Sequence, residues 1–394
     1  MTDVPILSIV IPTRDRYEYL LPMLDTLLRF PQGSVEIVVS DNTVDNAPLA
    51  DYVKRAQDAR LVYVYTAAPL TMHQNCELAL DTARGEYVCM LGDDDGILEW
   101  APDLATWMAA NGVDCALGNL PIYRWPVVVT RHYHEKTTGY VVLRSPSGRL
   151  RTVDVQRELR HVARDGGTQL HRSPRVYQGV VRRTCLAALK ANCGTYFPGP
   201  SPDIANAVGL CQFVRTMVQI DVPLIVSGTS PRSAGGKGSA GAHVGELESV
   251  RSLPPGTVDD WDPRVPRFWS GPTIWAEGTL KALKATHSAV TLNFPSLYAN
   301  SLVFHWNHRK RVWDAMAVYS AGSAAAWATC AAATIWNACG VVFARARAFV
   351  HTNAFRYCFP GFVRLTAMPT IRECTESLHE RYRSVAAPWR ALAK

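Results

Sequence analysis

Short apolar runs alternate with helical patterns over the first 118 residues of the chain. The runs contain β-branched and aromatic residues, as buried strands do, and they cover residues 7–11, 35–39, 61–65, 87–91 and 115–118. Between them, apolar residues recur at helical spacing over 17–29, 48–58, 71–83 and 99–110. This alternation predicts an α/β fold, in which a mostly parallel sheet with right-handed crossovers is flanked by helices.

Polar residues directly follow three of the predicted strands. Thr13 and Arg14 come after the first strand, Asp41 comes after the second, and residues 93–95 come after the fourth. In an open α/β sheet, ligands bind outside the carboxyl ends of the strands. The sequence therefore predicts that these side chains converge on one ligand-binding edge.

The fourth strand ends in three adjacent carboxylates, Asp93, Asp94 and Asp95. Like charges this close repel one another, so the arrangement is poor for stability alone. Carboxylate oxygens suit a divalent cation such as Mg²⁺ or Mn²⁺ that is held jointly with substrate phosphates. The alternative interpretation is a solvated acidic turn, because aspartate is a common turn residue.

Composition narrows the class of protein. The 394 residues are 48% hydrophobic and 19% charged, which predicts a globular protein of one large domain or two. The net charge of +7 suits a polyanionic ligand or an anionic membrane surface, and no basic tract with interleaved aromatics points to nucleic acid. The ten cysteines lack zinc-ligand spacing, so we expect reduced thiols and a cytoplasmic protein; the first residues resemble no signal peptide.

Several stretches together resemble the nucleotide-sugar domain of family 2 glycosyltransferases, which have the Rossmann-like GT-A fold. They are Ser-Ile-Val-Ile-Pro-Thr-Arg-Asp-Arg at 8–16, Glu-Ile-Val-Val-Ser-Asp-Asn-Thr at 36–43, Asn75, Ala-Arg-Gly-Glu-Tyr at 83–87 and the acidic triplet. The chain departs from the common family pattern at Asn42-Thr43, where Gly-Ser is usual, and at Gly92, where an aspartate is frequent.

The resemblance implies roles for individual residues of the first half. Pro12, Thr13 and Arg14 would line the base and phosphate side of a bound nucleotide, and Asn75 would belong to the same nucleotide site. Asp41 would accept a hydrogen bond from the uracil N–H. Asp93 would contact the ribose. Asp94 would hold the metal that bridges the diphosphate, as in the family's Asp-x-Asp motif, and Asp95 is a further candidate ligand.

The region after residue 120 has a weaker pattern. Runs at 140–143 and 150–155 flank Ser-Pro-Ser-Gly and suggest a hairpin, within either a solvated insertion or an acceptor-binding flap. The resemblance implies one GT-A domain over 1–250, with a nucleotide-sugar-binding half (1–119) and an acceptor-binding half (120–250). Residues 249–272 are rich in Pro, Asp and Arg and look like a linker to a C-terminal helical region over 273–394.

A second carboxylate of interest starts a helix. Ser201 suits the cap, Pro202 suits the first helical position, and Asp203 falls in the first turn, where the helix dipole alone favours a carboxylate. In family 2 enzymes a carboxylate at such a helix start is the catalytic base, so the resemblance implies this role for Asp203. Asp221 and Glu246 are the next candidates.

The Gly/Ser-rich stretch 228–242 carries Arg232 and Lys237 and reads as a loop that could close over a diphosphate. His243 follows it directly. In some GT-A enzymes a late histidine completes the metal shell, which makes His243 a candidate ligand, whereas a lone histidine is more often an ordinary surface or core residue.

The segment 317–344 is apolar and long enough to cross a membrane, but it is rich in alanine and contains serine, threonine and asparagine. Alanine barely drives insertion, so we expect a packed or interfacial helix and a protein that is at most peripheral at the inner face of the membrane.

These features favour a metal-dependent, inverting glycosyltransferase that uses Mn²⁺ or Mg²⁺ and moves a sugar from a UDP-sugar, or another nucleotide-sugar, to a hydroxyl of a glycan or lipid-linked acceptor. A processive polysaccharide synthase would carry a Gln-x-x-Arg-Trp signature, whereas Gln212 to Arg215 is followed by Thr216. A nucleotidyltransferase would have a Gly-rich first loop, which residues 13–16 lack. An inactive scaffold subunit would not need the intact triplet.

Overall fold

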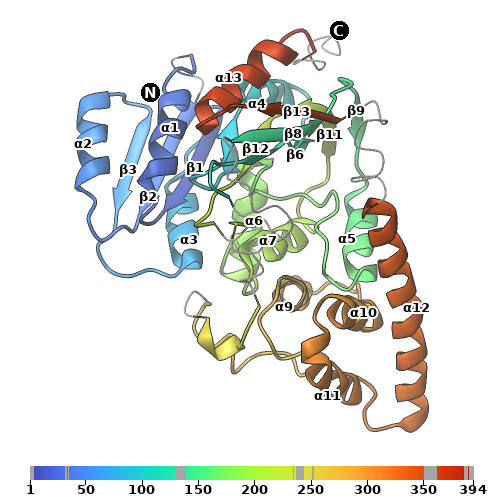
Figure 1. Cartoon of the computed structure of the whole chain (residues 1–394). Helices are drawn as coiled ribbons and strands as arrows, with labels where there is room; N and C mark the ends of the chain where they lie inside the picture. Colours follow the sequence, from blue (N-terminus) through green and yellow to red (C-terminus); the bar gives the residue numbers. More distant parts are fainter. Residues whose placement is uncertain are drawn as a thin grey trace.

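The computed structural model describes residues 4–31, 33, 35–128, 139–233, 235–236, 244–250, 253–349, 362–385 and 389. Within them, eight strands form a central sheet in the order β3-β2-β1-β4-β10-β6-β11-β9 (Figure 1). The strands are β1 (Leu7–Thr13), β2 (Val35–Asp41), β3 (Leu61–Tyr65), β4 (Tyr87–Met90), β6 (Cys115–Asn119), β9 (Leu150–Thr152), β10 (Val180–Arg182) and β11 (Met217–Pro223). β1 to β4 pair in parallel, as do β6 and β11, while β9 and β10 run antiparallel to their neighbours. The predicted α/β fold is confirmed.

Alternate residues of β1 face opposite sides of this sheet, as the two-residue period of a strand requires. Leu7, Ile9 and Ile11 enter one core, and Val10 enters the other. The first core also takes side chains from α1 (Tyr17–Leu27), α2 (Ala47–Ala56) and α4 (Ala101–Ala110). The second takes them from α3 (Met72–Thr82), α5 (Val155–Arg164), α6 (Arg183–Cys193) and α7 (Pro202–Leu210). Both faces of β1 are therefore buried in hydrophobic cores, which fixes the position of its carboxyl end.

A second sheet has the order β13-β8-β7-β12-β5. Its strands are β5 (Gly96–Ile97), β7 (Ile122–Arg124), β8 (Tyr140–Arg144), β12 (Ile225–Thr229) and β13 (Phe362–Thr366). The predicted hairpin over 140–155 is wrong, because β8 pairs with β7 and β13 in this sheet while β9 pairs with β11 in the central one. The turn between them therefore connects two sheets.

The region after the sheets is helical and has its own core. It contains η1 (Leu247–Ser249), α9 (Gly271–Ala285), α10 (Phe294–Phe304), η2 (Trp306–His308), α11 (Arg309–Tyr319) and α12 (Ala324–Phe349). Trp261, Val265 and Phe268, from the predicted linker, are buried in this core against α9 and α10. The described residues of this stretch therefore pack into a hydrophobic core, and the prediction that they form a linker is wrong.

The Ala-rich segment divides at a turn. α11 ends at Tyr319, residues Ala321 and Gly322 have positive φ angles of 48° and 73°, and α12 starts at Ala324. Among the described residues, Ala324–Ala346 is a candidate membrane span by length and composition, with a mean hydropathy of 1.4, and only 11% of its apolar window is buried. α12 packs along α10 on one side (Figure 1).

The last described elements return to the first half of the chain. β13 pairs with β8, and α13 (Ile371–Tyr382) packs against α1 and β5 (Figure 1). The predicted helical region 273–394 therefore describes α9 to α12 well but leaves this return out.

Candidate functional site

The carboxyl ends of β1, β2 and β4 meet at one edge of the central sheet. β1 lies between β2 and β4, and Thr13 is paired in register with Asp41. The Thr13 hydroxyl donates to Asp93 Oδ2 at 2.8 Å. The predicted convergence of these polar residues is thus confirmed, and the three aspartates 93–95 are all buried.

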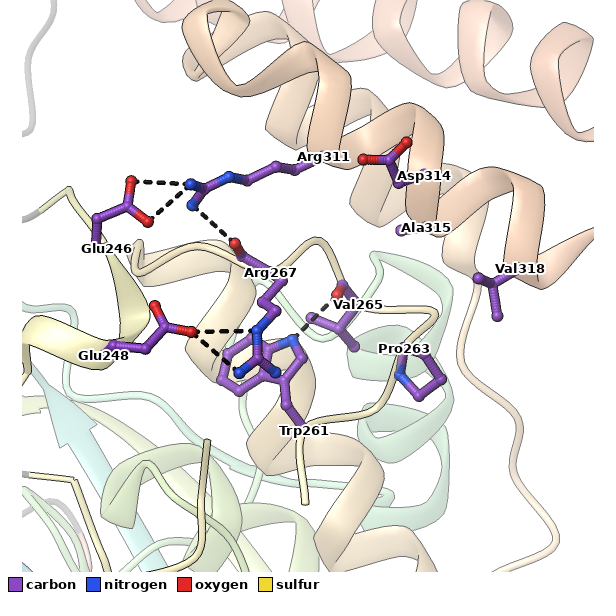
Figure 2. Close-up of a pocket in the computed structure, with 10 residues that line it drawn as sticks. All are labelled: Glu246, Glu248, Trp261, Pro263, Val265, Arg267, Arg311, Asp314, Ala315 and Val318. Carbon is purple, nitrogen blue, oxygen red and sulfur yellow. Dashed lines mark hydrogen bonds and ion pairs between the residues drawn. The ribbon is translucent and has the colours of Figure 1, made fainter. Parts of the chain in front are cut away.

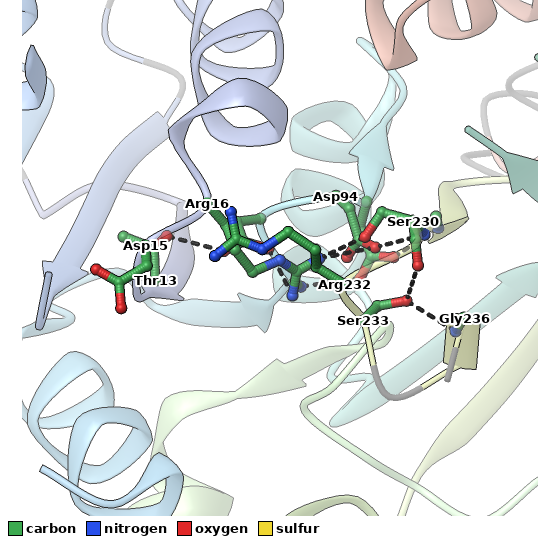
Figure 3. A network of polar contacts seen from close by, with 12 residues as sticks. Thr13, Asp15, Arg16, Asp94, Ser230, Arg232, Ser233 and Gly236 are labelled. Carbon is green, nitrogen blue, oxygen red and sulfur yellow. Dashed lines mark hydrogen bonds and ion pairs between the residues drawn. The ribbon is translucent and has the colours of Figure 1, made fainter. Parts of the chain in front are cut away.

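Arg16 lies at the centre of this edge (Figure 3). It precedes α1, and its Nη1 is 3.0 Å from Asp93 Oδ1 while its Nη2 is 2.9 Å from Asp94 Oδ2. The same Nη2 donates to Ser230 Oγ at 2.8 Å, and the guanidinium lies 5.4 Å from the centre of the Tyr19 ring. One cation therefore serves two buried carboxylates.

Burial dominates the electrostatics of Asp93. It raises the pKa of this carboxyl to about 7, and the neighbouring Asp94 adds to the rise, although Arg16 and the Thr13 hydroxyl lower the pKa. Burial penalises the charged form, whereas an opposite charge and donated hydrogen bonds favour it. Asp93 therefore needs positive charge nearby to remain ionised at neutral pH.

The third aspartate has different surroundings. Asp95 Oδ1 accepts from Gly228 N at 2.7 Å, Asp95 Oδ2 accepts from Gly92 N at 2.9 Å, and the Gln178 amide is 3.1 Å from both oxygens. These bonds tie the end of β4 to β12 and to the strand-like segment at Tyr177, which bridges Met90. The predicted metal role of Asp95 is therefore not favoured, because its lone pairs are engaged in structural bonds.

The remaining pair fits a divalent cation held partly by substrate. Asp93 Oδ1 is buried and has no hydrogen-bond partner, and Asp94 Oδ2 lies on the other side of the same guanidinium. No cluster of three or more His, Cys, Asp or Glu side chains suited to a metal occurs among the described residues. Mg²⁺ is usually coordinated by one or two carboxylates together with substrate phosphates. The carboxylates of Asp93 and Asp94 therefore suit an ion that is also bound to a nucleotide.

Asp41 and Asn75 are bound to protein groups. Asp41 is fully buried, and its Oδ2 accepts from the hydroxyls of Tyr17 at 2.6 Å and Tyr63 at 3.0 Å while its Oδ1 accepts from Thr43 N. Three protein donors thus already bind this carboxylate, which was predicted to accept a uracil N–H. The Asn75 amide donates to the carbonyls of Thr13 and Ser40 and so ties β1 to β2.

Two further predicted residues line the open side of the edge. Pro12 is half-buried at the end of β1. Arg14 is exposed, lies 3.6 Å from Asp15 and donates to the Leu70 carbonyl at 3.4 Å. Its guanidinium is therefore only loosely held and is accessible from solvent.

Asp203 lies at the start of α7, as predicted. The Ser201 hydroxyl, which was expected to cap the helix, donates instead to Asp203 Oδ1 at 2.5 Å. Burial, together with the charges of Asp95, Asp94 and Asp203, raises the pKa of the half-buried Tyr177 hydroxyl. Asp203 is not among the described ion-pair or hydrogen-bond partners of Arg16.

β12 and the residues directly after it contact the Arg16 cluster. Gly228 approaches so closely that a Cβ there would lie 1.7 Å from the Asp94 carbonyl oxygen. Ser230 N donates to Asp94 Oδ2 at 3.0 Å (Figure 3). Arg232 pairs with Glu18 at 3.0 Å. The start of the predicted loop therefore contacts the Arg16 cluster through Gly228 and Ser230. His243 lies outside the described residues.

The two alternative bases are engaged elsewhere. Asp221, on β11, accepts from the Ser147 hydroxyl and backbone N–H. Glu246 lies in a cleft of about 410 Å³ beside α11, where it pairs with Arg311 at 2.7 Å and the neighbouring Arg267 pairs with Glu248 (Figure 2). The charges of that cleft thus largely neutralise one another.

Sequence reasoning missed four contributors to the site. Arg16 stood within the polar turn after β1, and its position three residues beyond Thr13 was an available signal. Tyr177 and Gln178 belong to an irregular segment without periodicity, and Ser230 belongs to a predicted loop. Only the tertiary structure brings these three to the triplet.

The sequence of the chain is similar to those of known proteins. Residues 8–173 match the model of glycosyl transferase family 2. The uncharacterised protein y4gI of Sinorhizobium fredii is 28% identical over 120 residues, which cover 29% of this chain and 13% of that protein. The putative colanic acid biosynthesis glycosyl transferase WcaA of Escherichia coli is 29% identical over 104 residues, or 26% of this chain and 36% of WcaA. The matches thus span well under half of either relative.

Solved structures with a related arrangement share little sequence with the chain. TarS residues 1–349 from S. aureus, in complex with UDP-GlcNAc, aligns with a TM-score of 0.49 and 13% identity, covering 84% of this chain and 89% of that one. The mannosyltransferase PcManGT from Pyrobaculum calidifontis, in complex with GDP-Man and Mn²⁺, aligns with a TM-score of 0.38 and 17% identity over 85% and 88% of the two chains.

Proposed function

The chain belongs to glycosyltransferase family 2 through its residues 8–173, and from this premise we propose that it is an inverting glycosyltransferase. It takes a sugar from a nucleotide-sugar donor, most simply a UDP-sugar, and transfers it to a hydroxyl of a glycan or lipid-linked acceptor. The observation that supports this best is the cluster of Thr13, Asp93 and Asp94 around one cation at the edge of the sheet. A diphosphate needs such a site of fixed charge.

Asp93 and Asp94 are the residues that would hold Mn²⁺ or Mg²⁺ in this site. When bound, the ion neutralises the negative charge of the leaving diphosphate. Thr13 orients Asp93 through its hydroxyl, and Ser230 N orients Asp94, so the two carboxylates are preorganised for that task. Arg14, exposed at the rim, adds positive charge toward the nucleotide.

Asp203 is our candidate for the general base. An acceptor hydroxyl is a weak nucleophile at neutral pH, so a positioned carboxylate is needed to take its proton. The carboxylates of the triplet are occupied by Arg16 or by backbone groups and are unsuited to that task. The first turn of α7 favours the ionised form of Asp203, and the Ser201 hydrogen bond fixes its direction.

The acceptor and the location are proposed from two further observations. The name of WcaA, a putative colanic acid biosynthesis glycosyl transferase, supports a role in polysaccharide biosynthesis. We place the enzyme in the cytoplasm, at the inner face of the membrane. The exposed side of α12 presents apolar side chains followed by Arg345, which suits an anionic lipid surface; they are Ile335, Trp336, Val342 and Phe343.

A donor screen tests the proposed reaction. Glycosyltransferases of this kind are expected to hydrolyse their donor slowly without acceptor, so UDP- and GDP-sugars are incubated with the protein and Mn²⁺, and release of nucleoside diphosphate is measured. We expect release from one donor class, abolished by EDTA and by Asp94→Asn. Binding of a nucleotide-sugar without release in the presence of any tested acceptor would favour a scaffold subunit instead.

A further inference from the structure

Arg16 is the only described side chain that forms ion pairs with Asp93 and Asp94. The Arg16 side chain is 20% exposed, whereas those of Asp93 and Asp94 are 3% and 5% exposed. A buried carboxylate without a counter-charge is strongly unfavourable, and two that face the same point are more so. The guanidinium therefore makes the geometry of the two carboxylates possible in the donor-free protein.

The pairing is incomplete, however. Arg16 Nε and Asp93 Oδ1 are both buried without a hydrogen-bond partner, although Nη1 is only 3.0 Å from that oxygen. A buried polar atom left without a partner costs free energy. The guanidinium thus compensates the charge of the two carboxylates but leaves some of their hydrogen bonds unmade. Replacing the guanidinium by another cation therefore costs less free energy than it would if every hydrogen bond were made.

The Arg16 side chain can move while its backbone stays fixed. The Arg16 carbonyl accepts the N–H groups of Tyr19 and Leu20 at the start of α1, so the main chain is held by the helix. Beyond the carboxylates, its partners among the described residues are the ring of Tyr19 and the hydroxyl of the buried Ser230. A change of rotamer would therefore free both aspartates and leave the guanidinium beside them.

We propose that Arg16 is a built-in counter-ion that holds Asp93 and Asp94 in the donor-free enzyme, competes with the divalent cation for them, and yields when the nucleotide-bound ion arrives. The inference rests on the proposed function, since it assigns the cation site to those two residues. A divalent cation held by Asp93 and Asp94 would have to bind the carboxylates that Arg16 already pairs with, and the two positive charges would repel each other there. Arg16 thus keeps the empty site from taking up free metal and makes ion and nucleotide bind together.

The test compares Mn²⁺ binding to the donor-free protein and to two variants, by titration with detection of free Mn²⁺ by electron paramagnetic resonance. Arg16→Met keeps the length of the side chain and removes the competitor, so we expect Mn²⁺ to bind at least about tenfold more tightly than to the wild type. Arg14→Met removes a neighbouring charge that touches neither aspartate, and it should change the affinity by less than about threefold.

A stability measurement covers the case in which Arg16→Met folds poorly. In EDTA the variant leaves two buried carboxylates unpaired, so its melting temperature should fall below that of the wild type, and Mn²⁺ should raise it by more than it raises the wild type. Arg16→Lys, which keeps one charge but cannot bridge both oxygens, should lie between the two in both measurements.

Unchanged or weaker Mn²⁺ binding by Arg16→Met, together with no greater stabilisation by Mn²⁺, would overturn the proposal. That result is distinct from failure of the proposed function. If the wild type binds UDP with Mn²⁺ but the variant shows no gain in donor-free Mn²⁺ affinity, the enzyme assignment stands and only the competition by Arg16 is wrong.

Discussion

At the scale of single residues, the site is defined by which carboxylates remain available to a ligand. Asp93 and Asp94 share one guanidinium, whereas Asp95 and Asp41 are saturated by backbone and tyrosine groups. Among the residues that the structure describes, the side-chain partner of Asp203 is the Ser201 hydroxyl. Three adjacent aspartates thus have two different kinds of surroundings because their partners differ.

Asp203→Asn tests the candidate base. The variant keeps the shape of the side chain and removes its basicity, so we expect turnover to fall by about 10²–10⁴-fold while UDP binding is nearly unchanged. The measurement is kcat with the best donor and acceptor, together with calorimetry of UDP. Asp221→Asn serves as the control and should retain near-normal turnover. Loss of UDP binding in Asp203→Asn would show that Asp203 is structural, and near-normal turnover would place the base elsewhere.

The pH dependence of metal binding tests the surroundings of Asp93. Its pKa is raised to about 7, so below pH 7 the carboxyl is largely protonated and must release its proton when the ion binds. As the pH increases toward 7, the apparent affinity of Mn²⁺ with UDP should therefore increase by up to about tenfold per pH unit, and it should level off above pH 7. Calorimetry from pH 5.5 to 8 measures this. An affinity that is constant over that range would show that Asp93 is ionised throughout or does not bind the ion.

The positions of several site residues could be predicted from sequence because they depend on strand ends alone. Thr13, Asp93 and Asp94 each directly follow a recognisable strand, so their convergence was foreseeable. The saturation of Asp95 was not, since its partners lie more than 80 residues away in the chain, Gly228 on β12 and Gln178 in an irregular segment. Apolar periodicity carries no information about which backbone N–H a carboxylate will accept.

At the scale of elements, close packing of β12 on the triplet is what fixes Asp94 and Asp95. Gly228 lets the β12 backbone reach both residues, and Ser230 continues the contact. Sequence patterns predicted that β8 and β9 form one hairpin, because an alternating pattern shows that a strand exists and not which strand it pairs with.

Gly228→Ala tests this packing. The added Cβ would overlap the Asp94 carbonyl, so β12 must shift, and we expect a loss of about 1–3 kcal/mol in the free energy of unfolding together with weaker UDP binding. Gly271→Ala is the matched control, since nothing lies within 4 Å of the corresponding Cβ. Denaturant unfolding of both variants measures the difference. Equal stability of the two would contradict the described contact of β12 with the triplet.

Substitutions on the exposed side of α12 test the proposal that this helix contacts a membrane. Trp336 and Phe343 are 80% and 71% exposed, one above the other at a spacing of seven residues. If they enter a lipid surface, changing both to serine should weaken binding to vesicles with anionic lipid by at least about tenfold. Trp313→Ser, on α11, should have little effect. Carbonate should strip the wild type from native membranes, and retention until detergent is added would identify α12 as a span.

At the scale of the whole molecule, distant parts of the chain converge on the triplet. α13 packs against β5, which directly follows Asp95, and a Cβ at Gly96 would collide with Ile371. The α/β class was predictable from the repeated strand and helix patterns. The return of the C-terminal residues was not, because nothing local in β13 or α13 names its partners.

The central claim is that this edge of the sheet binds a nucleoside diphosphate through an ion held by Asp93 and Asp94. Calorimetry of UDP binding in Mn²⁺ and in EDTA tests it most directly, with Asp94→Asn as the matched variant. The account predicts measurable binding of UDP to the wild type in Mn²⁺, a loss of at least about tenfold in EDTA, and a similar loss in the variant. Equal affinity in Mn²⁺ and EDTA, or full affinity in Asp94→Asn, would contradict it.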